Sequence, residues 1–551
     1  MKEALEPRPG PTITPTAQVS IVVIAYNDVA HVSEAVRSAL AQGAPGQTVT
    51  EVIAVNDAST DGTGAALDTL ARADPRLRVI HRAENSGGCG TPRNDGVRAA
   101  TGRFVMFLDS DDVLPPGAVQ ALLTAALRHD APVTAGACVR RELPSRRDVA
   151  WQPGLYREAA VHGSPESSPQ LVRDTLCVNK LYDRAFLTEH DIAFPEGRFT
   201  YEDFVFTARV LAAAPRIATI PDSVYVWHVR RAAAKQSISL DRKDVANWQA
   251  RIDAHRTSVQ IFEDAGHKAL AHAADIKFLD HDLRMYVREL HTRGADYRAE
   301  WWRLTRAYLA RFDEADLLAA RAPARWLARV VLASPEPRDL ERLTHLAARP
   351  GRLLPPYAEA GGRAVWSADL PEVELDALGT KPMHRLPVTV DAEPVIGARN
   401  VLRLRVHEMY GRLAAAEPVT IDVELRRRTD DRRGTVHTAA LTASAPPGDG
   451  AGVCWTAEVV LDLAALAARD GSRSADPEPW DLMAQVTCAN GAGFRASLRA
   501  TGPGLRRRVL PSRRHALLLV QPYATTGGAL SLRIACGLRS VWRIAARRLR
   551  R

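Results

Sequence analysis

The fold is decided by residues 104–112, which read FVMFLDSDD and place spaced carboxylates directly after an apolar run. Short runs of β-branched and aromatic residues are typical of strands that are buried on both faces of a parallel sheet. Residues 52–57 repeat the arrangement as VIAVND. Ligands of such sheets collect at the carboxyl ends of the strands, where both acidic clusters lie. The sequence therefore predicts an α/β sheet with an acidic site at one edge.

Apolar strands alternate with amphipathic helices from residue 19 to about residue 103. Further strands are predicted at residues 19–24 and 77–81, and a short helix at residues 93–100. This alternation is typical of a single α/β domain.

The pattern changes after residue 241. No proline occurs between Asp222 and Ala322, and apolar residues recur there at steps of three, four or seven. This spacing predicts a helical linker domain.

Beyond Pro371 the apolar period shortens to two, as in residues 419–425, which read VTIDVEL. Alternation of this kind, interrupted by turn-forming residues, predicts strands. We expect a β-sandwich over about residues 380–505 and then a hairpin that turns at residues 525–528.

Composition narrows the class of protein. The 551 residues are 46% hydrophobic, enough for about two or three separate cores. The net charge of +9 is mild for this length, so it favours an anionic substrate or surface without requiring nucleic acid, and we expect no nucleic-acid partner. Six scattered cysteines without a CxxC pair suit reduced thiols, and the amino terminus lacks the apolar core of a signal peptide. These features predict a cytoplasmic protein.

The last stretch, residues 541–551, sets apolar residues among five arginines. It could lie peripherally on the inner, anionic face of the cell membrane. The alternative is a terminal helix with a solvated basic face, because one short helix binds membranes weakly.

Six short motifs within roughly the first 240 residues resemble those of the inverting family 2 glycosyltransferases of the GT-A fold. In chain order they are VSIVVIAYN (19–27), VNDASTDGT (55–63), RN (93–94), LDSDD (108–112), NKLY (179–182) and YED (201–203). The chain departs from the family at Ala25, where proline is usual, at Asn56, where aspartate is common, and at Pro92, where alanine is frequent. None of these departures removes a carboxylate that the chemistry requires.

Asp109 and Asp111 suit a divalent cation, either Mn²⁺ or Mg²⁺. Transfer of a sugar from a nucleoside diphosphate needs a cation to neutralise the departing diphosphate, and hard divalent ions prefer carboxylate oxygens. Alternate residues at a strand end point to opposite sides, so we expect Asp111 to meet the metal and Asp109 to meet either the metal or the nucleotide. The alternative for the pair is a polar turn between strand and helix.

The resemblance implies that the donor, a UDP-sugar, binds to loops that follow the strands. Tyr26 and Asn27 match the family's first nucleotide-contacting loop, although Asn27 could instead cap a helix. Asp57 matches the acid that accepts a hydrogen bond from the base ring, and capping is again the alternative. Arg93 matches a contact to the diphosphate, with a surface salt bridge as its alternative. The glycines within residues 85–90 permit close approach of the backbone to a ligand.

By resemblance, Asp203 is the general base. It would take a proton from the acceptor hydroxyl while that oxygen attacks the anomeric carbon from the face opposite the diphosphate, which inverts that carbon. Glu202 is expected to orient the acceptor or support the base, and an acidic pair at a helix start is the alternative. Arg231, Lys235 and Ser237 resemble the lid that closes over the donor diphosphate, whereas a flexible basic linker would carry the same residues.

The order of domains resembles the cytoplasmic enzymes that decorate wall teichoic acid, an anionic polyol-phosphate polymer. In those enzymes the tail domain assembles a homotrimer, so we expect a homo-oligomer here. A transferase for capsular or lipid-linked polysaccharide is the alternative enzyme, and an inactive carbohydrate-binding scaffold is the alternative from another class. The expected parts are a flexible tail (1–18), a GT-A catalytic domain (19–240), a helical linker domain (241–370), an immunoglobulin-like β-sandwich domain (371–510), and a terminal hairpin with a basic helix (511–551).

Overall fold

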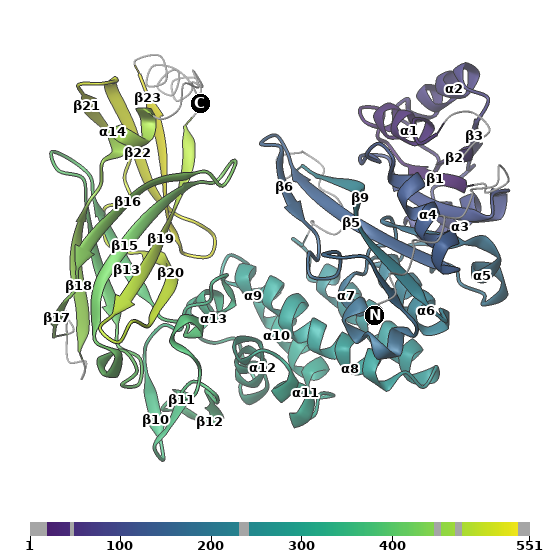
Figure 1. The fold of residues 1–551 in the computed structure, drawn as a ribbon. Coiled ribbons are helices and arrows are strands. Elements are labelled where there is room, and N and C mark those ends of the chain that lie inside the picture. The colour runs from purple at the N-terminus through teal and green to yellow at the C-terminus, as the bar shows by residue number, and fades with distance from the viewer. Residues whose placement is uncertain (1–18, 44–48, 231–241, 446–452, 469–476, 538–551) are drawn as a thin grey trace, which may run out of the picture. The chain divides into compact units, whose positions relative to one another are not determined.

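The computed structural model describes residues 19–43, 49–230, 242–445, 453–468 and 477–537 (Figure 1). The chain forms two compact units, Met1–Phe278 and Leu279–Arg551. The expected amino-terminal tail, the expected lid residues Arg231, Lys235 and Ser237, and the terminal basic stretch lie outside the described residues.

A mixed nine-stranded sheet forms the centre of the first unit. Its order is β3-β2-β1-β4-β8-β5-β9-β7, and β6 pairs with β5. Strands β3, β2, β1 and β4 are parallel, whereas β8 runs antiparallel to both β4 and β5. The strands are β1 (Val19–Ala25), β2 (Val49–Asn56), β3 (Leu77–His81), β4 (Phe104–Asp109), β5 (Val133–Glu142), β6 (Arg147–Ala150), β7 (Ala160–His162), β8 (Lys180–Asp183) and β9 (Ile217–Val229).

The strands predicted at the two acidic runs and at their neighbours occur as β1 to β4. Every residue of β1 is buried, and β4 is buried up to its last residue, Asp109. Strands that are covered on both faces explain why the sequence reads as continuous apolar runs rather than as alternation.

Helices pack around this sheet, and two of them, α7 and α8, come after residue 241 in the chain. The helices of the first unit are α1 (Val32–Leu40), α2 (Thr63–Ala73), α3 (Gly90–Ala99), α4 (Ala118–His129), α5 (Arg184–Glu189), α6 (Glu202–Ala213), α7 (Ala246–Asp264) and α8 (Lys268–Lys277). Helix α3 approaches β1 closely: a Cβ at Gly96 would lie 2.2 Å from Val22 Cγ1. Helix α7 packs against α6 and α8, so the first unit extends to Phe278.

The second unit begins with helices and continues with strands. Its helices are α9 (Arg284–Leu290), α10 (Ala295–Leu309), α11 (Glu314–Ala319), α12 (Ala322–Ala333), α13 (Leu340–Ala347) and α14 (Leu463–Ala468). A small sheet contains β10 (Ala358–Ala360), β11 (Arg363–Ser367) and β12 (Leu370–Glu374). Within the described residues, no helix of either unit combines the length and the apolar character needed to cross a membrane.

An 11-stranded sheet makes up most of the second unit. Its strands are β13 (Val390–Val395), β14 (Val401–His407), β15 (Pro418–Arg427), β16 (Arg433–Ala440), β17 (Thr442–Ser444), β18 (Cys454–Val460), β19 (Glu478–Cys488), β20 (Gly493–Ala500), β21 (Arg508–Ser512), β22 (Ala516–Ala524) and β23 (Leu530–Cys536). Burial alternates along β19, as the period of two predicts. The expected hairpin is formed by β22 and β23, and β23 pairs with β19, so the hairpin belongs to the large sheet. An α/β domain, a helical region and a sheet-rich region thus follow one another in the predicted order.

Candidate active site

Two loops at the carboxyl edge of the first sheet are tied together by Asn27. Its backbone lies in the left-handed region, with φ of 50°. Its Oδ1 accepts a hydrogen bond from Thr60 N at 2.7 Å, and its own N–H donates to Ser59 Oγ at 3.0 Å. The preceding Tyr26 is 43% exposed. The loops after β1 and β2 therefore form one surface, on which the Tyr26 ring is accessible.

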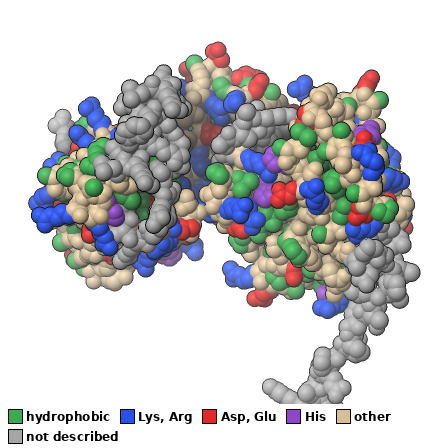
Figure 2. All heavy atoms as spheres, turned by 90° about the horizontal axis from the view of Figure 1, so that it is seen from above, with side chains coloured by type: hydrophobic (Ala, Val, Ile, Leu, Met, Phe, Trp, Pro, Cys, Tyr) green, Lys and Arg blue, Asp and Glu red, His purple; other side chains and the backbone are tan. Residues whose placement is uncertain are grey.

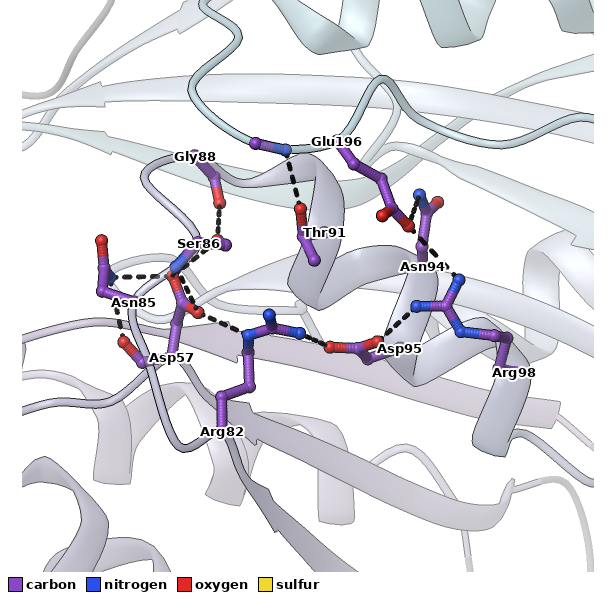
Figure 3. A network of polar contacts seen from close by, with 11 residues as sticks. Asp57, Arg82, Asn85, Ser86, Gly88, Thr91, Asn94, Asp95, Arg98 and Glu196 are labelled. Atoms are coloured by element: carbon purple, nitrogen blue, oxygen red, sulfur yellow. Dashed lines mark hydrogen bonds and ion pairs between the residues drawn. The ribbon is translucent and has the colours of Figure 1, made fainter.

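Asp57 follows β2 and is buried, and both of its carboxylate oxygens accept hydrogen bonds (Figure 3). Oδ1 lies 2.9 Å from Arg82 Nε and 3.1 Å from Ser86 N. Oδ2 accepts from Asn85 Nδ2 at 2.9 Å and from Ser86 Oγ at 2.8 Å. The side chain thus fixes the loop after β3, and contact with a base ring stays a prediction.

The glycine-rich loop of residues 85–90 packs against the segment that leads into α6. A Cβ at Gly90 would lie 2.0 Å from Pro195 O, and one at Gly88 would lie 2.5 Å from Gly197 O. Two side chains of α3 hold the same segment. Thr91 Oγ1 accepts a hydrogen bond from Gly197 N at 2.9 Å, and Asn94 Nδ2 donates to Glu196 Oε1 at 3.1 Å (Figure 3). Asn94 also exchanges two 2.9 Å hydrogen bonds with the backbone of Phe194. The close approach that these glycines permit is therefore to protein backbone, where a ligand was expected.

Arg93 joins the end of β4 to the start of α6. Its side chain is 4% exposed; Nη2 lies 2.7 Å from Asp109 Oδ1, and Nη1 lies 2.5 Å from Glu202 Oε1. The guanidinium also lies 5.3 Å from the centroid of the Phe194 ring. The guanidinium thus already has two carboxylate partners, and its contact with a diphosphate stays a prediction. We name this arrangement the Arg93 bridge.

Asp109 and Asp111 fit a divalent cation. Their side chains are 34% and 43% exposed, so carboxylate oxygens are accessible, and Asp111 Oδ2 lies 3.3 Å from Arg230 Nη1. Burial and the Asp109 charge raise the pKa of Asp111 to about 6, against the opposing effect of Arg230. Within the described residues no group of three or more His, Cys, Asp or Glu is arranged to hold an ion. Two carboxylates suit a cation whose remaining ligands are water and substrate phosphates.

Asp112 fastens the turn after β4 to β9. It is 3% exposed and accepts hydrogen bonds at 2.7 Å from Tyr225 OH and from His228 N. Burial, and then the charges of Asp111 and Asp109, raise its pKa well above the usual range. The carboxylate of Asp112 is therefore held by structural hydrogen bonds, whereas the side chains of Asp109 and Asp111 are partly exposed to solvent.

Asp203 lies in the first turn of α6, beside the Arg93 bridge. Burial and the adjacent Glu202 raise its pKa to about 7, while Arg93, Arg251 and Lys277 oppose the rise. A carboxyl with a pKa near neutrality can exchange a proton at physiological pH, which is what a general base requires.

The NKLY motif builds a buried support rather than an open site. Lys180 Nζ lies 2.8 Å from Asp174 Oδ2, which also accepts a hydrogen bond from Asn179 Nδ2 at 3.0 Å. Trp151 Nε1 donates to the other carboxylate oxygen of Asp174 at 2.8 Å. Hydrogen bonds thus compensate the charges of this buried ion pair, which a buried pair requires to offset the cost of desolvation.

Sequence reasoning missed Arg230 and Arg251 as neighbours of the acidic residues. Arg230 stands next to Arg231 in one basic run, which was the available signal. Arg251 carried no signal, because it lies on α7, in a stretch that reads only as an amphipathic helix.

The mixed sheet, the spaced acids at the end of β4 and the acid at the start of α6 define a glycosyltransferase of the GT-A class. Residues 20–168 match the sequence model of glycosyl transferase family 2. Succinoglycan biosynthesis protein ExoO of Rhizobium meliloti (strain 1021) is 32% identical over 248 residues, which cover 42% of this chain and 67% of that protein. The chain belongs to glycosyl transferase family 2.

Two further comparisons concern the enzyme TarS of Staphylococcus aureus. The poly(ribitol-phosphate) beta-N-acetylglucosaminyltransferase TarS of Staphylococcus aureus (strain Mu50 / ATCC 700699) is 31% identical over 212 residues, covering 38% of this chain and 35% of TarS. The match thus spans about a third of that relative. The crystal structure of S. aureus TarS superposes with a TM-score of 0.51 at 18% identity, covering 94% of this chain and 85% of that one, which shows a shared fold.

Proposed function

We propose that this chain is a metal-dependent inverting glycosyltransferase that moves a sugar from a UDP-sugar to a hydroxyl of a polyol-phosphate, teichoic-acid-like polymer. The Arg93 bridge carries the proposal, because it couples Asp109, a candidate cation ligand, to the helix start that holds Asp203. The similarity to TarS, named as a poly(ribitol-phosphate) beta-N-acetylglucosaminyltransferase, supports the substrate class. The positive net charge suits an anionic acceptor, and Figure 2 shows Lys and Arg side chains spread over the visible face among acidic ones.

In the proposed mechanism, Asp203 takes the proton of the acceptor hydroxyl. That oxygen forms the new bond to the anomeric carbon from the face opposite the diphosphate, and the bond to the diphosphate breaks with its electron pair leaving on UDP. The anomeric carbon is inverted as a result. Asp109 and Asp111 would hold Mn²⁺ or Mg²⁺, which supplies charge neutralisation to the departing diphosphate. Glu202 keeps the base in place through its ion pair with Arg93.

The donor contacts in this proposal are those of the family resemblance. Tyr26 and Asn27 meet the nucleotide, Asp57 meets the base ring, and Arg93 lies within reach of the diphosphate. The expected lid is made of Arg231, Lys235 and Ser237. The proposal also includes the order of catalytic domain, helical region and β-rich region, a homo-oligomeric state, and a cytoplasmic location with peripheral contact at the inner face of the cell membrane.

A second candidate acceptor is a capsular or lipid-linked polysaccharide. The similarity to ExoO, named for succinoglycan biosynthesis, favours it. The two candidates share donor chemistry and differ only in the acceptor.

Release of UDP from a panel of UDP-sugars tests the proposal, with Mn²⁺, Mg²⁺ or EDTA and with or without polyol-phosphate polymer. We expect metal-dependent release that increases with polymer and is lost in Asp203→Asn but not in Asp264→Asn, a variant of an exposed residue at the end of α7. Release that ignores polyol-phosphate and responds to another polysaccharide would transfer the assignment to the second candidate. Absence of any UDP-sugar turnover would contradict the proposal.

A further inference from the structure

We propose that Arg251 of α7 is a positioning residue for Asp203. Arg251 holds the rings of Tyr201 and Phe204, which flank the Glu202–Asp203 pair, and its positive charge favours the ionised form of the base. The inference rests on the proposed function of Asp203. It gives a role in the reaction to a helix beyond the residues that match the family model.

Arg251 stacks on the two rings that flank the acidic pair. Its Cζ lies 4.6 Å from the ring centroid of Tyr201 and 4.9 Å from that of Phe204, and these two rings are 5.4 Å apart. The side chain is 7% exposed. A guanidinium over two aromatic faces is attracted to both, and the attraction is stronger where water is excluded. The position of Arg251 and that of the acidic pair are therefore coupled.

Tyr201 adds a second constraint, because it is the cap residue immediately before α6. It adopts φ of 66°, a left-handed conformation that is rare for a bulky side chain. Its hydroxyl donates to Asn247 Oδ1 of α7 at 2.9 Å. The contact of Arg251 with the ring and the hydrogen bond of the hydroxyl thus hold the backbone conformation that determines where the side chains of Glu202 and Asp203 point.

Helices α7 and α8 form a firm support for these contacts. Trp248 of α7 stacks on Phe278 with ring centroids 5.5 Å apart, and His255 stacks on the same ring at 4.6 Å. His255 Nε2 also lies 3.1 Å from Ala274 O. At the end of α8, Lys277 Nζ lies 4.0 Å from the centroid of Phe204. The two helices thus bring two cations to the aromatic neighbours of the base.

The charge balance around Asp203 makes this arrangement chemically relevant. Burial and Glu202 favour the protonated acid, while Arg93, Arg251 and Lys277 favour the carboxylate. The titratable and charged groups that interact electrostatically with Asp203 include Glu202 of α6, Arg93 of α3, Cys89, Cys177, Tyr182 of β8, Arg251 of α7 and Lys277 of α8. Loss of one nearby cation raises the pKa of a carboxyl by about one unit or more.

The pH dependence of kcat/KM for UDP release tests this role in Arg251→Gln, Arg251→Lys and a control, Arg256→Gln. Arg256 lies on the same helix with its side chain 63% exposed and pairs with Asp253. We expect the acidic limb of Arg251→Gln to move upward by about one pH unit, with activity recovering toward pH 9. Arg251→Lys should move it less, and Arg256→Gln should overlay the parent. Lys277→Gln should shift the limb in the same direction and serves as the second variant if Arg251→Gln fails to fold.

Loss of turnover at every pH without movement of the acidic limb, in both Arg251→Gln and Lys277→Gln, would overturn the inference. Asp203→Asn separates this failure from failure of the proposed function. If Asp203→Asn is inactive while the limb stays in place in the cation variants, the role of Arg251 is wrong and the base assignment stands. If Asp203→Asn keeps the rate and the acidic limb, the base assignment itself is wrong, and the inference falls with it.

Discussion

Replacement of Arg93 by glutamine removes the centre of the Arg93 bridge and leaves two carboxylates without their cation. Breaking a buried ion pair by deleting one partner costs about 3–5 kcal/mol. Asp109 is 34% exposed and Glu202 12%, so solvent compensates part of this loss, and we expect about 3 kcal/mol. At about 2–4 °C per kcal/mol for a unit of this size, the melting temperature should fall by roughly 6–12 °C.

Thermal unfolding followed by circular dichroism measures this effect in Arg93→Gln against Arg98→Gln. Arg98 lies on the same helix with its side chain 60% exposed, and it pairs with Asp95 and Glu196. Exposed pairs contribute about 0–1 kcal/mol, so the control should melt within a few degrees of the parent. Equal melting temperatures for the two variants would refute the view that the bridge holds β4 and α6 together. A double-mutant cycle with Glu202→Gln would locate the coupling in this pair.

Three further predictions follow from the same site. Gly90→Ala places a Cβ 2.0 Å from Pro195 O, so it should lower stability by about 1–3 kcal/mol and also reduce turnover. The control Gly154→Ala, whose Cβ meets no atom within 4 Å, should change neither stability nor turnover. Denaturant unfolding measures the stability, and UDP release measures the turnover. Asp203→Asn should stabilise the fold by up to about 4 kcal/mol at pH 8 and by almost nothing at pH 4, because each unit by which the pKa is raised penalises the charged form by about 1.4 kcal/mol, and this penalty appears only as pH rises from about 4 through 7; equal gains at both pH values in urea unfolding would contradict this. Asp111→Asn should raise the Mn²⁺ concentration that gives half-maximal UDP release by 10-fold or more, and unchanged metal dependence would remove Asp111 from the cation site.

Local pattern was sufficient for the strands that position the site. The runs that became β1 and β4 are buried on both faces, so burial leaves a continuous apolar signal in the sequence. The alternation that predicted β19 likewise reflects one buried and one exposed face. Asp109 and Asp111 could be placed at this edge in advance, because Asp109 ends a recognisable strand and Asp111 lies two residues further on.

The local sequence pattern could not predict contacts between residues that lie far apart in the chain. Arg93 and Glu202 lie 109 positions apart, and nothing in periodicity says that one buried guanidinium will meet two carboxylates. The glycines of the loop at residues 85–90 indicate that another group approaches this loop closely. They do not indicate which group, and the structure shows that it is the backbone at Pro195 and Gly197. Arg251 reads as one polar position on an amphipathic helix, and only the packing of α7 on α6 brings it to Tyr201.

The proposed function depends most directly on Asp203, and one paired measurement tests this role: UDP binding by calorimetry and sugar transfer to polymer, both in Asp203→Asn with saturating Mn²⁺. We expect unchanged affinity for UDP and a rate of transfer lower by about 10²–10⁴-fold, since the donor loops remain while the base is absent. Transfer within a few fold of the parent rate would contradict it.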